Sequence, residues 1–503
     1  MSERTPSSRR SVSRGLVKSL LCALGIGATC LALAASGIPG DVTAQGLGNP
    51  DPDIKAMNKA FQNYMKSVKD MQKEFLSAVT FGLDDAHAVG AYDLITSFLN
   101  STNRSQLTAS GSGRRDYPRF AGFDDPDTRI GVDNPDTQYM GTVVNNADCE
   151  GVWRIFGNRS NTVDFILTTF DTGSGTGGGP TLEDEDMVDV NGDSLGVDED
   201  FVVYAGCGAD PGIVDPDGAE YTWFDIQAIP TDQLQFARRQ SACDWEQEVP
   251  GEIHIERVGS RGVPSGPLDP AIMTEQILDG KAILDVQGPF WPAFVDSIRN
   301  NIPVNTATPW QPTGGLGITT QLNMLMWYDL ADDEALVIRL PDEDVAAYYG
   351  LQLSNFWGSS ADWANRHVSM SWGLGGTCQA EQASVPTPHP AQAVIKANGG
   401  PEDCGFQRAY FIVVSKEDPG VQNWIETAEM SQGLIAGRLQ SVPAVDFPSV
   451  AGFSCMLPVA FTLPTAAVQG FLGQLGAAPY TPAERAAQLE VRQDYARSKY
   501  VFW

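Results

Sequence analysis

The sequence has few of the residue patterns by which metal-dependent and nucleophilic enzymes are identified. Its four histidines, His87, His254, His367 and His389, are scattered without HxH or HExxH spacing, and no two cysteines form a CxxC motif. These absences argue against a zinc site and against thiol–disulfide exchange chemistry. The glycine-rich stretch 173–179 contains no lysine and opens no evident helix, so a phosphate-binding loop is not expected.

Basic residues and long apolar runs are also scarce. The chain has 33 Lys and Arg against 63 Asp and Glu, which gives a formal net charge of −30. Such a surface repels nucleic acid and anionic lipid. It suits either solubility in salty surroundings or the attraction of cationic partners. Beyond the N-terminal region no stretch approaches about 20 apolar residues, so an integral membrane protein is not expected.

Residues 1–44 have the features of a signal peptide. Five basic residues precede an apolar run from Leu20 to Ala35, and Val42-Thr-Ala44 offers a small-residue cleavage site. Ser8-Arg9-Arg10 partly matches a twin-arginine signal, so the Sec and twin-arginine routes both stay open. We therefore expect an exported protein, periplasmic or secreted.

Six cysteines follow this segment, and an even number in an exported chain predicts disulfides. Cys378 and Cys404 flank a segment rich in Pro, Gln and Ala, so they are predicted to close it. Cys207 and Cys243 are a second predicted pair. The remaining cysteines, Cys149 and Cys455, are left without an assignment.

The next segment, residues 45–112, is predicted to be helical. From Asp53 onward, apolar residues recur at spacings of three and four, which places them on one stripe of an α-helix. The stripe packs either onto the body of the chain or against a second chain as a short coiled coil. Another helix is predicted after Asp84, carrying Leu94, Ile95 and Phe98. The members of the stripe are Ile54, Met57, Phe61, Tyr64, Val68, Met71 and Phe75.

Residues 113–260 and 319–445 are predicted to form two β lobes, because short apolar segments are separated by Gly, Pro and Asp turns. Many short strands of this kind favour antiparallel β-sandwiches or jelly rolls over a parallel α/β sheet. The fold class is therefore mainly β, with two such lobes, an N-terminal helical segment and a helical bridge.

The bridge and linker occupy residues 261–318. One helix is predicted from Pro270 to about Leu278 and a second from Pro292, because each proline suits a first helical turn. Residues 306–317 are the predicted linker. The C-terminal extension, residues 446–503, is predicted to end in a helix that begins at the capping box Thr481-Pro-Ala-Glu484.

Two separated blocks place turn-forming residues beside polar groups: Asp133-Asn-Pro-Asp-Thr-Gln-Tyr139 and Asp418-Pro-Gly-Val-Gln-Asn-Trp-Ile-Glu-Thr427. Together with residues 152–159, 332–341 and 348–357, in this order, they resemble the bacterial domain-of-unknown-function family numbered 1214, often accompanied by family 1254. The resemblance covers residues 125–440. It implies a mostly β, two-lobed protein and supplies no catalytic residue.

The first block holds the predicted catalytic residues. Asp136 would act as a base or a ligand anchor, and Tyr139 would donate a proton or a hydrogen bond. Arg154, in the following strand, would hold an anionic group or keep Asp136 ionised. Asn134 is a predicted ligand-binding residue of the same block. The alternative is structural, because Asn-Pro-Asp is typical of a turn and Tyr139 would then simply begin a strand.

A matching group of predicted ligand-binding residues lies in the second lobe. Alternation along the strand places Tyr348 and Gln352 on one face and Tyr349 and Leu351 on the other. The polar-aromatic face would bind a sugar or another flat ligand, or else it faces solvent. The group consists of Tyr348, Gln352, Asn355, Trp357 and Arg366.

The second block begins with Asp418-Pro-Gly, which is predicted to form a tight turn because Pro and Gly supply its dihedral angles. Trp424 follows this turn and is expected to pack between the lobes. A structural role is therefore favoured for the block.

An acidic loop at residues 189–200 partly matches a calcium-binding loop, with oxygen ligands at Asp189, Asn191 and Asp193. It departs from the pattern because Ser194 replaces the glycine of the sharp turn and Asp200 replaces the usual glutamate. The expectation is therefore no cofactor, with calcium at this loop as the alternative.

Three functions are compatible with these features. The first is binding of a carbohydrate-like or amphipathic small molecule between the lobes, where the two groups of polar residues would meet. The second is a hydrolase or lyase with Asp136 as base and Tyr139 as acid. The third is a structural envelope protein that assembles through the N-terminal stripe. Binding of a small molecule is favoured, because no catalytic motif is recognised.

Overall fold

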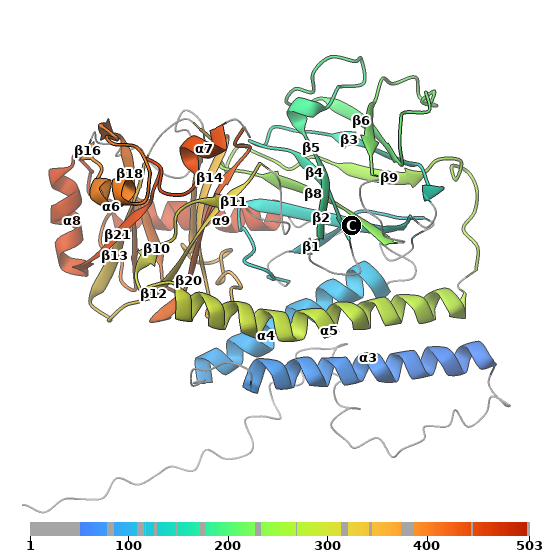
Figure 1. The fold of residues 1–503 in the computed structure, drawn as a ribbon, viewed down its shortest axis with the longest axis horizontal. Helices are drawn as coiled ribbons and strands as arrows, with labels where there is room; N and C mark the ends of the chain where they lie inside the picture. The colour runs from blue at the N-terminus through green and yellow to red at the C-terminus, as the bar shows by residue number, and fades with distance from the viewer. Residues whose placement is uncertain are drawn as a thin grey trace, which may run out of the picture. The chain divides into compact units, whose positions relative to one another are not determined.

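Two β-sandwiches lie beside a layer of helices in the computed structural model (Figure 1). The structure describes residues 51–77, 85–107, 115, 117–124, 128–146, 149–171, 177–226, 233–267, 269–312, 320–341, 345–373, 387–443 and 446–499. The described chain from Ala56 onward belongs to one compact unit. The prediction of a mainly β protein with two sandwich lobes is confirmed.

The first sandwich packs a sheet of order β1-β2-β8-β4-β5 against a sheet of order β7-β6-β3-β9. Its strands pair antiparallel except β6 and β7, which are parallel. Apolar residues that alternate along the strands fill the space between the sheets, among them Val144, Ile155 and Phe236. The elements are β1 (Ala121–Asp124), β2 (Thr137–Asn145), β3 (Trp153–Asn158), β4 (Ile166–Asp171), β5 (Gly177–Glu183), the 3₁₀ turn η3 (Asp184–Asp186), β6 (Asp200–Gly206), β7 (Thr222–Asp225), β8 (Gln233–Ser241) and β9 (Ile253–Arg257).

The second sandwich packs the order β10-β12-β20-β14-β15 against β19-β18-β13-β21. Its core includes Leu336, Ile412 and Ile435, and again one edge pair, β18 and β19, is parallel. Its elements are β10 (Thr306–Ala307), β11 (Gln311–Pro312), β12 (Leu322–Asp329), β13 (Glu334–Pro341), β14 (Tyr348–Ser354), β15 (Ser369–Gly373), β18 (Ala409–Ser415), β19 (Trp424–Glu426), β20 (Gln432–Gln440) and β21 (Val459–Pro464). Beside them lie β16 (Thr387–Pro388), β17 (Phe406–Gln407), α6 (Gln392–Ala397) and α7 (Phe447–Val450).

The second sandwich extends beyond the predicted bounds of the second lobe, 319–445, at both ends. The described part of the predicted linker 306–317 contributes β10 and β11, which pair with β12. The C-terminal extension is also part of the sandwich, because β21 pairs with β13. It continues into α8 (Thr465–Gln474) and α9 (Pro482–Lys499). The predicted capping box is confirmed: the Thr481 backbone N–H donates to Glu484 Oε2 at 2.7 Å, and the Glu484 N–H donates to Thr481 Oγ1 at 3.3 Å.

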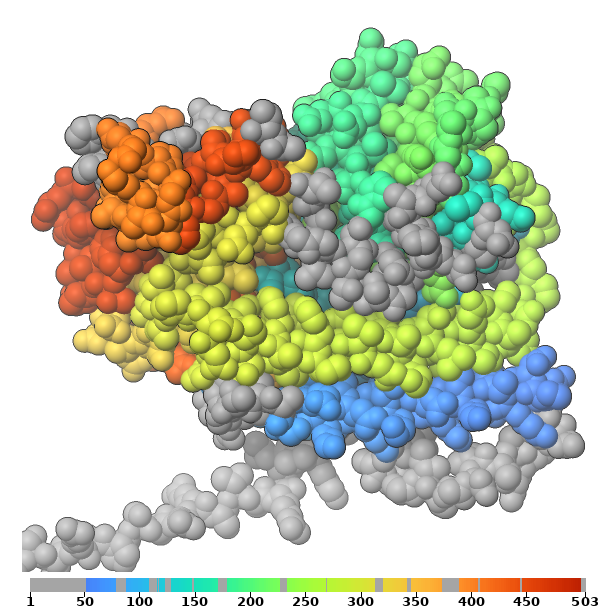
Figure 2. Space-filling view, in the orientation of Figure 1, coloured from blue at the N-terminus to red at the C-terminus, as the bar shows by residue number. Residues whose placement is uncertain are grey.

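The helical layer consists of α3 (Pro52–Ser77), α4 (Asp85–Thr102), the π-helical turn η1 (Asn103–Leu107) and α5 (Pro270–Asn301). The predicted stripe packs onto the body of the chain, since Tyr64, Met71 and Phe75 are buried with residues of α5 and the second sandwich. Gly288 of α5 allows this approach, because a Cβ there would lie 3.3 Å from the Met71 Cα. Phe61 departs from the stripe and is 51% exposed. Figure 2 shows α3 and α5 side by side along one face of the molecule.

One helix, α5, replaces the two helices predicted in the bridge. It begins as expected, because the Asp269 side chain accepts a hydrogen bond from the Ala271 N–H at 2.8 Å. Pro289 and Pro292 then lie inside the helix, where each lacks an N–H donor. Packing offsets the free energy lost with the missing helical hydrogen bonds. Gln233 of the first sandwich donates to Asp279 of α5, and Trp291 is buried in the helical core.

Both predicted disulfides are wrong. Cys207 pairs with Cys149, and Cys404 pairs with Cys455. The first pair forms because β3 and β6 are antiparallel neighbours, which brings the segment that leads into β3, with Cys149, close to Cys207, the residue after β6. The second forms because the segment around α6 packs on the chain that precedes β21, where His389 contacts the carbonyl of Leu457. Cys243 is also disulfide-bonded.

The predicted signal peptide, residues 1–44, and the apolar terminus, residues 500–503, lie outside the described residues. Within the described ranges, no helix combines the length and apolar character that crossing a membrane requires.

Candidate functional site

A cavity of about 610 Å³ lies where the two sandwiches meet the helical layer. Cavities that hold drug-sized ligands have volumes of about 300–1,000 Å³, so this one can enclose a small molecule. The outer faces of both sandwiches, the loop 130–133 and the helices α4 and α5 all contribute to its lining.

The first sandwich contributes Tyr139, Phe170, Gln235 and Arg239 to this lining. Along β2, β4 and β8 these residues alternate with those of the sandwich core, so they face away from it. Tyr139 and Arg239 are directly opposite each other in the β2–β8 register. The guanidinium carbon of Arg239 lies 5.3 Å from the Tyr139 ring centroid and 5.9 Å from that of Phe170, which orients this half-buried cation.

The second sandwich contributes β12 and β20, and Arg438 is its charged member. Arg438 is only 8% exposed. Its guanidinium donates to Gln352 Oε1 through Nη1 and to the Val132 carbonyl through Nη2. These bonds hold a buried positive charge at the surface of the cavity. Asn323 and Gln321 add uncharged polar groups to the same wall.

Asp133 is the one carboxylate among the described residues that line the cavity. Its Oδ1 accepts a hydrogen bond from the Ser360 N–H at 2.7 Å, and Oδ2 accepts another from the Ser360 hydroxyl. Burial raises the pKa of Asp133 above its usual value, although Ser360, Arg129 and Arg438 oppose the rise. The carboxyl group is therefore engaged by Ser360 of the second sandwich.

The helices supply an apolar wall. Phe98 of α4 and Phe290, Trp291 and Phe294 of α5 line the cavity. Ring centroids of Trp291 lie 6.0 Å from Phe98, 5.4 Å from Phe290 and 5.3 Å from Phe294, so the four rings form one aromatic cluster. The cavity thus has arginines and amides on its sheet walls and aromatic rings on its helical wall.

Four of the predicted site residues come together, in a buried contact between the two sandwiches. The Tyr348 hydroxyl donates to Asp136 Oδ2 at 2.6 Å, and Asn134 Nδ2 donates to the Tyr348 oxygen at 3.0 Å. Gln352 Nε2 donates to the Val132 carbonyl at 3.0 Å. Burial, together with the charge of Asp136, raises the pKa of Tyr348 well above its usual value, so the phenol stays protonated as a donor.

This contact alters the interpretation of β14. The predicted alternation is correct, since Tyr349 and Leu351 face the sandwich core. The opposite face, with Tyr348 and Gln352, is buried as well. It does not face solvent, because the first sandwich covers it.

We expect Tyr348→Phe to lower the free energy of unfolding by about 1–3 kcal/mol, because the buried Asp136 carboxylate loses the hydrogen bond from the Tyr348 hydroxyl. The shift of the urea unfolding midpoint measures this loss. Tyr92→Phe is the matched control, because the Tyr92 hydroxyl accepts a bond from Gln72 at an exposed position. The control is expected to stay within about 0.5 kcal/mol of the wild type. Equal shifts in both variants would contradict a special role for the Tyr348 contact.

The remaining predicted site residues are dispersed. Tyr139 lines the cavity, whereas Asp136 is not among the described residues that line it. Arg154 lies on the other sheet of the first sandwich and pairs with Asp215 at 2.7 Å, so it does not hold Asp136 ionised. Arg366 pairs with Glu426 at the surface of the second sandwich.

Asn355 and Trp357 have local structural roles. The Asn355 side-chain oxygen accepts hydrogen bonds from the N–H groups of Trp357 at 2.8 Å and Ser359 at 3.2 Å, which fixes the turn after β14. Trp357 is buried against the helical layer, and its indole N–H donates to the His87 carbonyl at 2.7 Å. Neither residue belongs to the described lining of the cavity.

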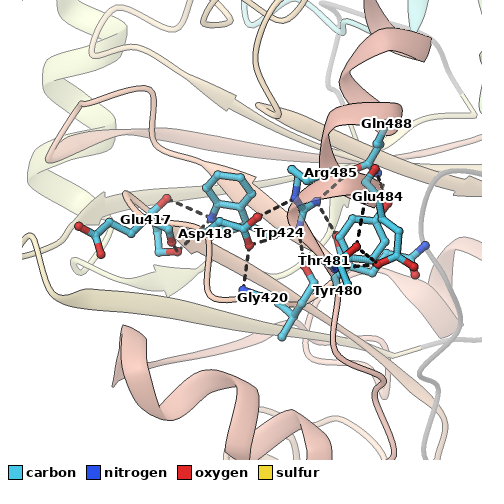
Figure 3. Close-up of polar contacts among 12 residues, drawn as sticks. Glu417, Asp418, Gly420, Trp424, Tyr480, Thr481, Glu484, Arg485 and Gln488 are labelled. Atoms are coloured by element: carbon cyan, nitrogen blue, oxygen red, sulfur yellow. Dashed lines mark hydrogen bonds and ion pairs between the residues drawn. The ribbon is translucent and has the colours of Figure 1, made fainter.

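The second block, residues 418–427, anchors the terminal helix (Figure 3). Arg485 of α9 donates through Nε to Asp418 Oδ2 at 2.9 Å and through Nη1 to the Gln422 carbonyl at 3.2 Å. Its guanidinium carbon lies 4.9 Å from the Trp424 ring and 4.5 Å from the Tyr480 ring. Trp424 therefore packs within the second sandwich and against α9, and the expectation that it lies between the lobes is wrong.

The acidic loop at residues 189–200 is organised by its own hydrogen bonds. Asp189 Oδ1 accepts from the N–H groups of Asn191 at 2.8 Å and Asp193 at 2.9 Å. The pKa of Asp189 is lowered, mainly by a hydrogen bond from the Asn191 side chain. Within the described residues no group of three or more His, Cys, Asp or Glu is placed to hold a metal ion. Residues 192–196 spell Gly-Asp-Ser-Leu-Gly, but they form a turn between β5 and β6, not a strand-to-helix elbow.

Sequence reasoning missed Arg239, Arg438 and Trp291. Arg438 is the one charged residue of the strand 432–440, and Arg239 directly follows Arg238 in the strand 233–241, whose other residues are uncharged. An arginine on the face opposite the core of such a strand is the signal that could have indicated a covered polar surface. Trp291 gave no signal, because the aromatic residues around it suit an ordinary helical core.

No protein-family model matches the chain, and no curated protein matches it. In structure the chain is similar to an uncharacterised protein from Burkholderia cenocepacia, with a TM-score of 0.63 and 17% identity over 82% of this chain and 99% of that chain. The VPA0106 protein from Vibrio parahaemolyticus aligns over 79% of this chain and 100% of that chain, with a TM-score of 0.39 and 11% identity. The first similarity shows a shared fold; the resemblance to family 1214 stays a prediction.

Proposed function

We propose that this protein binds an amphipathic small molecule in the cavity between its two sandwiches and its helical layer. The observation that supports the proposal is the two-sided lining of the cavity. Aromatic rings around Trp291 offer apolar contact on one side, whereas Tyr139, Arg239 and Arg438 offer hydrogen bonds and charge on the other. A mostly apolar cavity with a few convergent polar groups is typical of small-molecule sites.

Binding is favoured over the hydrolase or lyase alternative by the positions of the two proposed catalytic residues. Tyr139 lines the cavity, but the Asp136 carboxylate accepts a hydrogen bond from the buried hydroxyl of Tyr348. A base must reach the proton that it removes, within about 3 Å or through one water. The assembly hypothesis loses support because the N-terminal stripe is buried within the chain.

We also propose export of the mature protein through the N-terminal segment 1–44. The disulfides Cys149–Cys207 and Cys404–Cys455 support this, because such bonds persist in oxidising compartments outside the cytoplasm. A site that binds amphipathic molecules would then act in the periplasm or the medium.

The test is uptake of N-phenyl-1-naphthylamine, a neutral apolar probe whose fluorescence rises in an apolar pocket. Ser101 of α4 lines the cavity, so Ser101→Phe is expected to fill part of it and to weaken probe binding at least about tenfold, or ~1.4 kcal/mol. Thr96→Phe places the same ring on an exposed part of α4 and is expected to bind like the wild type. Absence of saturable uptake by the wild type, or equal uptake by all three proteins, would reject the proposal.

A further inference from the structure

We infer that the buried carboxyl groups of Glu183 and Asp164 form a proton-dependent latch between the two sandwiches, which holds the cavity walls together at low pH and loosens them as pH rises. The latch consists of these two residues together with Thr320, Ser241 and Gln440. This inference deepens the proposed function, on which it rests for the ligand of the cavity, and it specifies how release of that ligand is regulated.

Glu183 is the point where the first sandwich contacts the chain that leads into β12. It is 4% exposed, and its Oε1 accepts a hydrogen bond from the Thr320 hydroxyl. The Thr320 carbonyl accepts another from the Val442 N–H at 3.0 Å, which fixes Thr320 to the second sandwich. The next residue, Gln321, lines the cavity. A change at the Glu183 contact is therefore transmitted to the cavity wall through one peptide bond.

Asp164 is the second buried carboxyl group at this contact, since Glu183 lies opposite Ile166 in the β4–β5 register. Its Oδ1 accepts a hydrogen bond from the Ser241 N–H, and its Oδ2 has no hydrogen-bond partner in the described part of the chain. The Ser241 hydroxyl donates to Gln440 Oε1 of the second sandwich at 2.7 Å. Both carboxyl groups are thus connected to the second sandwich, one directly and one through Ser241.

The charges that act on Glu183 are negative. Among the described residues no ion pair joins Glu183 to a cation, and Thr320, which faces it from the second sandwich, is uncharged. Burial, followed by the charge of Asp164, raises the pKa of Glu183 to about 8. The other acids that raise it belong to the turn η3 and are Asp184, Glu185 and Asp186.

Asp164 faces a mixed set of groups. Arg159 and Asp184 act on it with opposite charges and are paired with each other at 2.5 Å. On the side of α9 the Tyr495 phenol stays protonated, because burial raises its pKa well above the usual value. Burial also raises the pKa of Glu248, the next acid along this boundary, to about 7. For Asp164 itself, burial outweighs the hydrogen bonds and Arg159, and it raises the pKa to about 7.

These pKa values give the direction of the response. A neutral carboxyl group is compatible with the buried contact, whereas an ionised one favours an open state in which water reaches it. The pKa of Glu183 changes from about 8 in the contact to 4.5 in water. The latch is therefore strongest below about pH 4.5, and its opening equilibrium rises by up to about tenfold per pH unit until about pH 8. Asp164 adds to the rise up to about pH 7.

The first test is amide hydrogen exchange of the whole protein at pH 6.5–8.5, corrected for the intrinsic exchange rate. Peptides with Ser241 and Val442 report the latch, because both N–H groups donate to its members. Their opening equilibrium is expected to rise at least about fivefold between pH 7 and 8. The central strand β18 is the internal reference and is expected to open far more rarely, because it is fully buried.

Three variants assign the response. Glu183→Gln keeps an acceptor for Thr320 and is expected to lose most of the rise between pH 7 and 8. Asp164→Asn is expected to reduce the rise chiefly below about pH 7. Glu185→Gln removes an exposed neighbouring charge and is expected to behave like the wild type.

The second test is the affinity for N-phenyl-1-naphthylamine, which is neutral throughout this pH range. A ligand that binds only the closed form loses affinity in proportion to the closed fraction. The wild type is expected to bind the probe at least about threefold more weakly at pH 8.5 than at pH 6.5. Glu183→Gln is expected to change little over the same range.

Each contrary outcome rejects a different step. If the latch peptides exchange only together with β18, the opening is global and the latch is wrong. If the pH dependence survives in Glu183→Gln, or is lost equally in Glu185→Gln, the assignment to Glu183 is wrong. If the latch opens but probe affinity is independent of pH, its control of the cavity is wrong. If the probe binds at no pH while exchange still follows Glu183, the proposed function fails and the latch stands.

Discussion

Arg485→Ala is expected to lower the free energy of unfolding by about 3–5 kcal/mol, one of the two largest effects that we expect in this protein. Arg485 bonds to the Asp418 carboxylate and to the carbonyls of Val421 and Gln422. Its side chain is 9% exposed and that of Asp418 is 31% exposed. Removing the buried Arg485 side chain takes the charged partner from Asp418 and a donor from the Val421 carbonyl, and it also removes the cation that packs on two aromatic rings, which together explain the size of the effect.

The midpoint and slope of urea unfolding measure this effect. Arg497→Ala is the matched control in the same helix, because Arg497 pairs with Asp494 at an exposed position and a surface pair contributes at most about 1 kcal/mol. Arg485→Lys keeps the charge but loses the planar fork, so an intermediate loss is expected. A loss below about 1 kcal/mol in Arg485→Ala would show that the block at 418–427 folds without this anchor.

The second large effect is a fall in stability as pH rises from 6.5 to 8. Burial raises the pKa of Glu183 to about 8 from 4.5, with the charge of Asp164 as a further cause. Burial also raises the pKa of Asp164 and that of Glu248 to about 7 each. In this window the folded protein keeps protons that the unfolded chain has already lost, so stability decreases by up to ~1.4 kcal/mol per pH unit for each group.

Two buried histidines oppose this fall only in the lower part of the window. Burial lowers the pKa of His367 to about 3 and that of His389 to about 4. Both are neutral in the folded protein, and the unfolded chain loses its histidine protons mainly between about pH 5.5 and 7.5, so their contribution increases stability with pH up to about pH 7.5. The slope between about pH 7.5 and 8 therefore reports chiefly the carboxyl groups.

Glu183→Gln tests the assignment. Glu183 Oε1 accepts a hydrogen bond from the Thr320 hydroxyl, which joins the two sandwiches, and glutamine keeps an acceptor oxygen there. The variant is expected to lose most of the decline between pH 7 and 8. Glu185→Gln changes an exposed neighbour and is expected to keep the wild-type slope. An unchanged slope in Glu183→Gln would mean that this carboxyl is ionised in the folded protein.

Local patterns in the sequence predicted those elements whose boundaries depend on neighbouring residues. The Thr481–Glu484 capping box and the Asp269 cap are present, because caps are formed by residues within one helical turn. Strand alternation correctly assigned Tyr349 and Leu351 to the core. The predicted apolar stripe of α3 packs onto the body of the chain, except at Phe61, whose side chain is exposed.

Predictions failed where the local structure depends on residues that are distant in the sequence. Pro289 and Pro292 have the character of helix starts, yet packing on both sandwiches keeps α5 continuous. The cysteine pairs follow from strand pairing and from how segments pack, neither of which spacing reveals. Asp136 and Tyr139 are neighbours in sequence but have different surroundings, because one faces the second sandwich and the other the cavity.

The sequence by itself determined the class of the fold, the helix caps and the face that each strand presents, since these depend on alternation and on contacts within a few residues. The tertiary structure decided which polar residues hold the sandwiches together and which remain at a cavity. That distinction depends on the approach of β14 and β20 to the first sandwich. The same approach uses Asp136 and Tyr348 as a buried contact and leaves Arg239 on the sheet wall of the cavity.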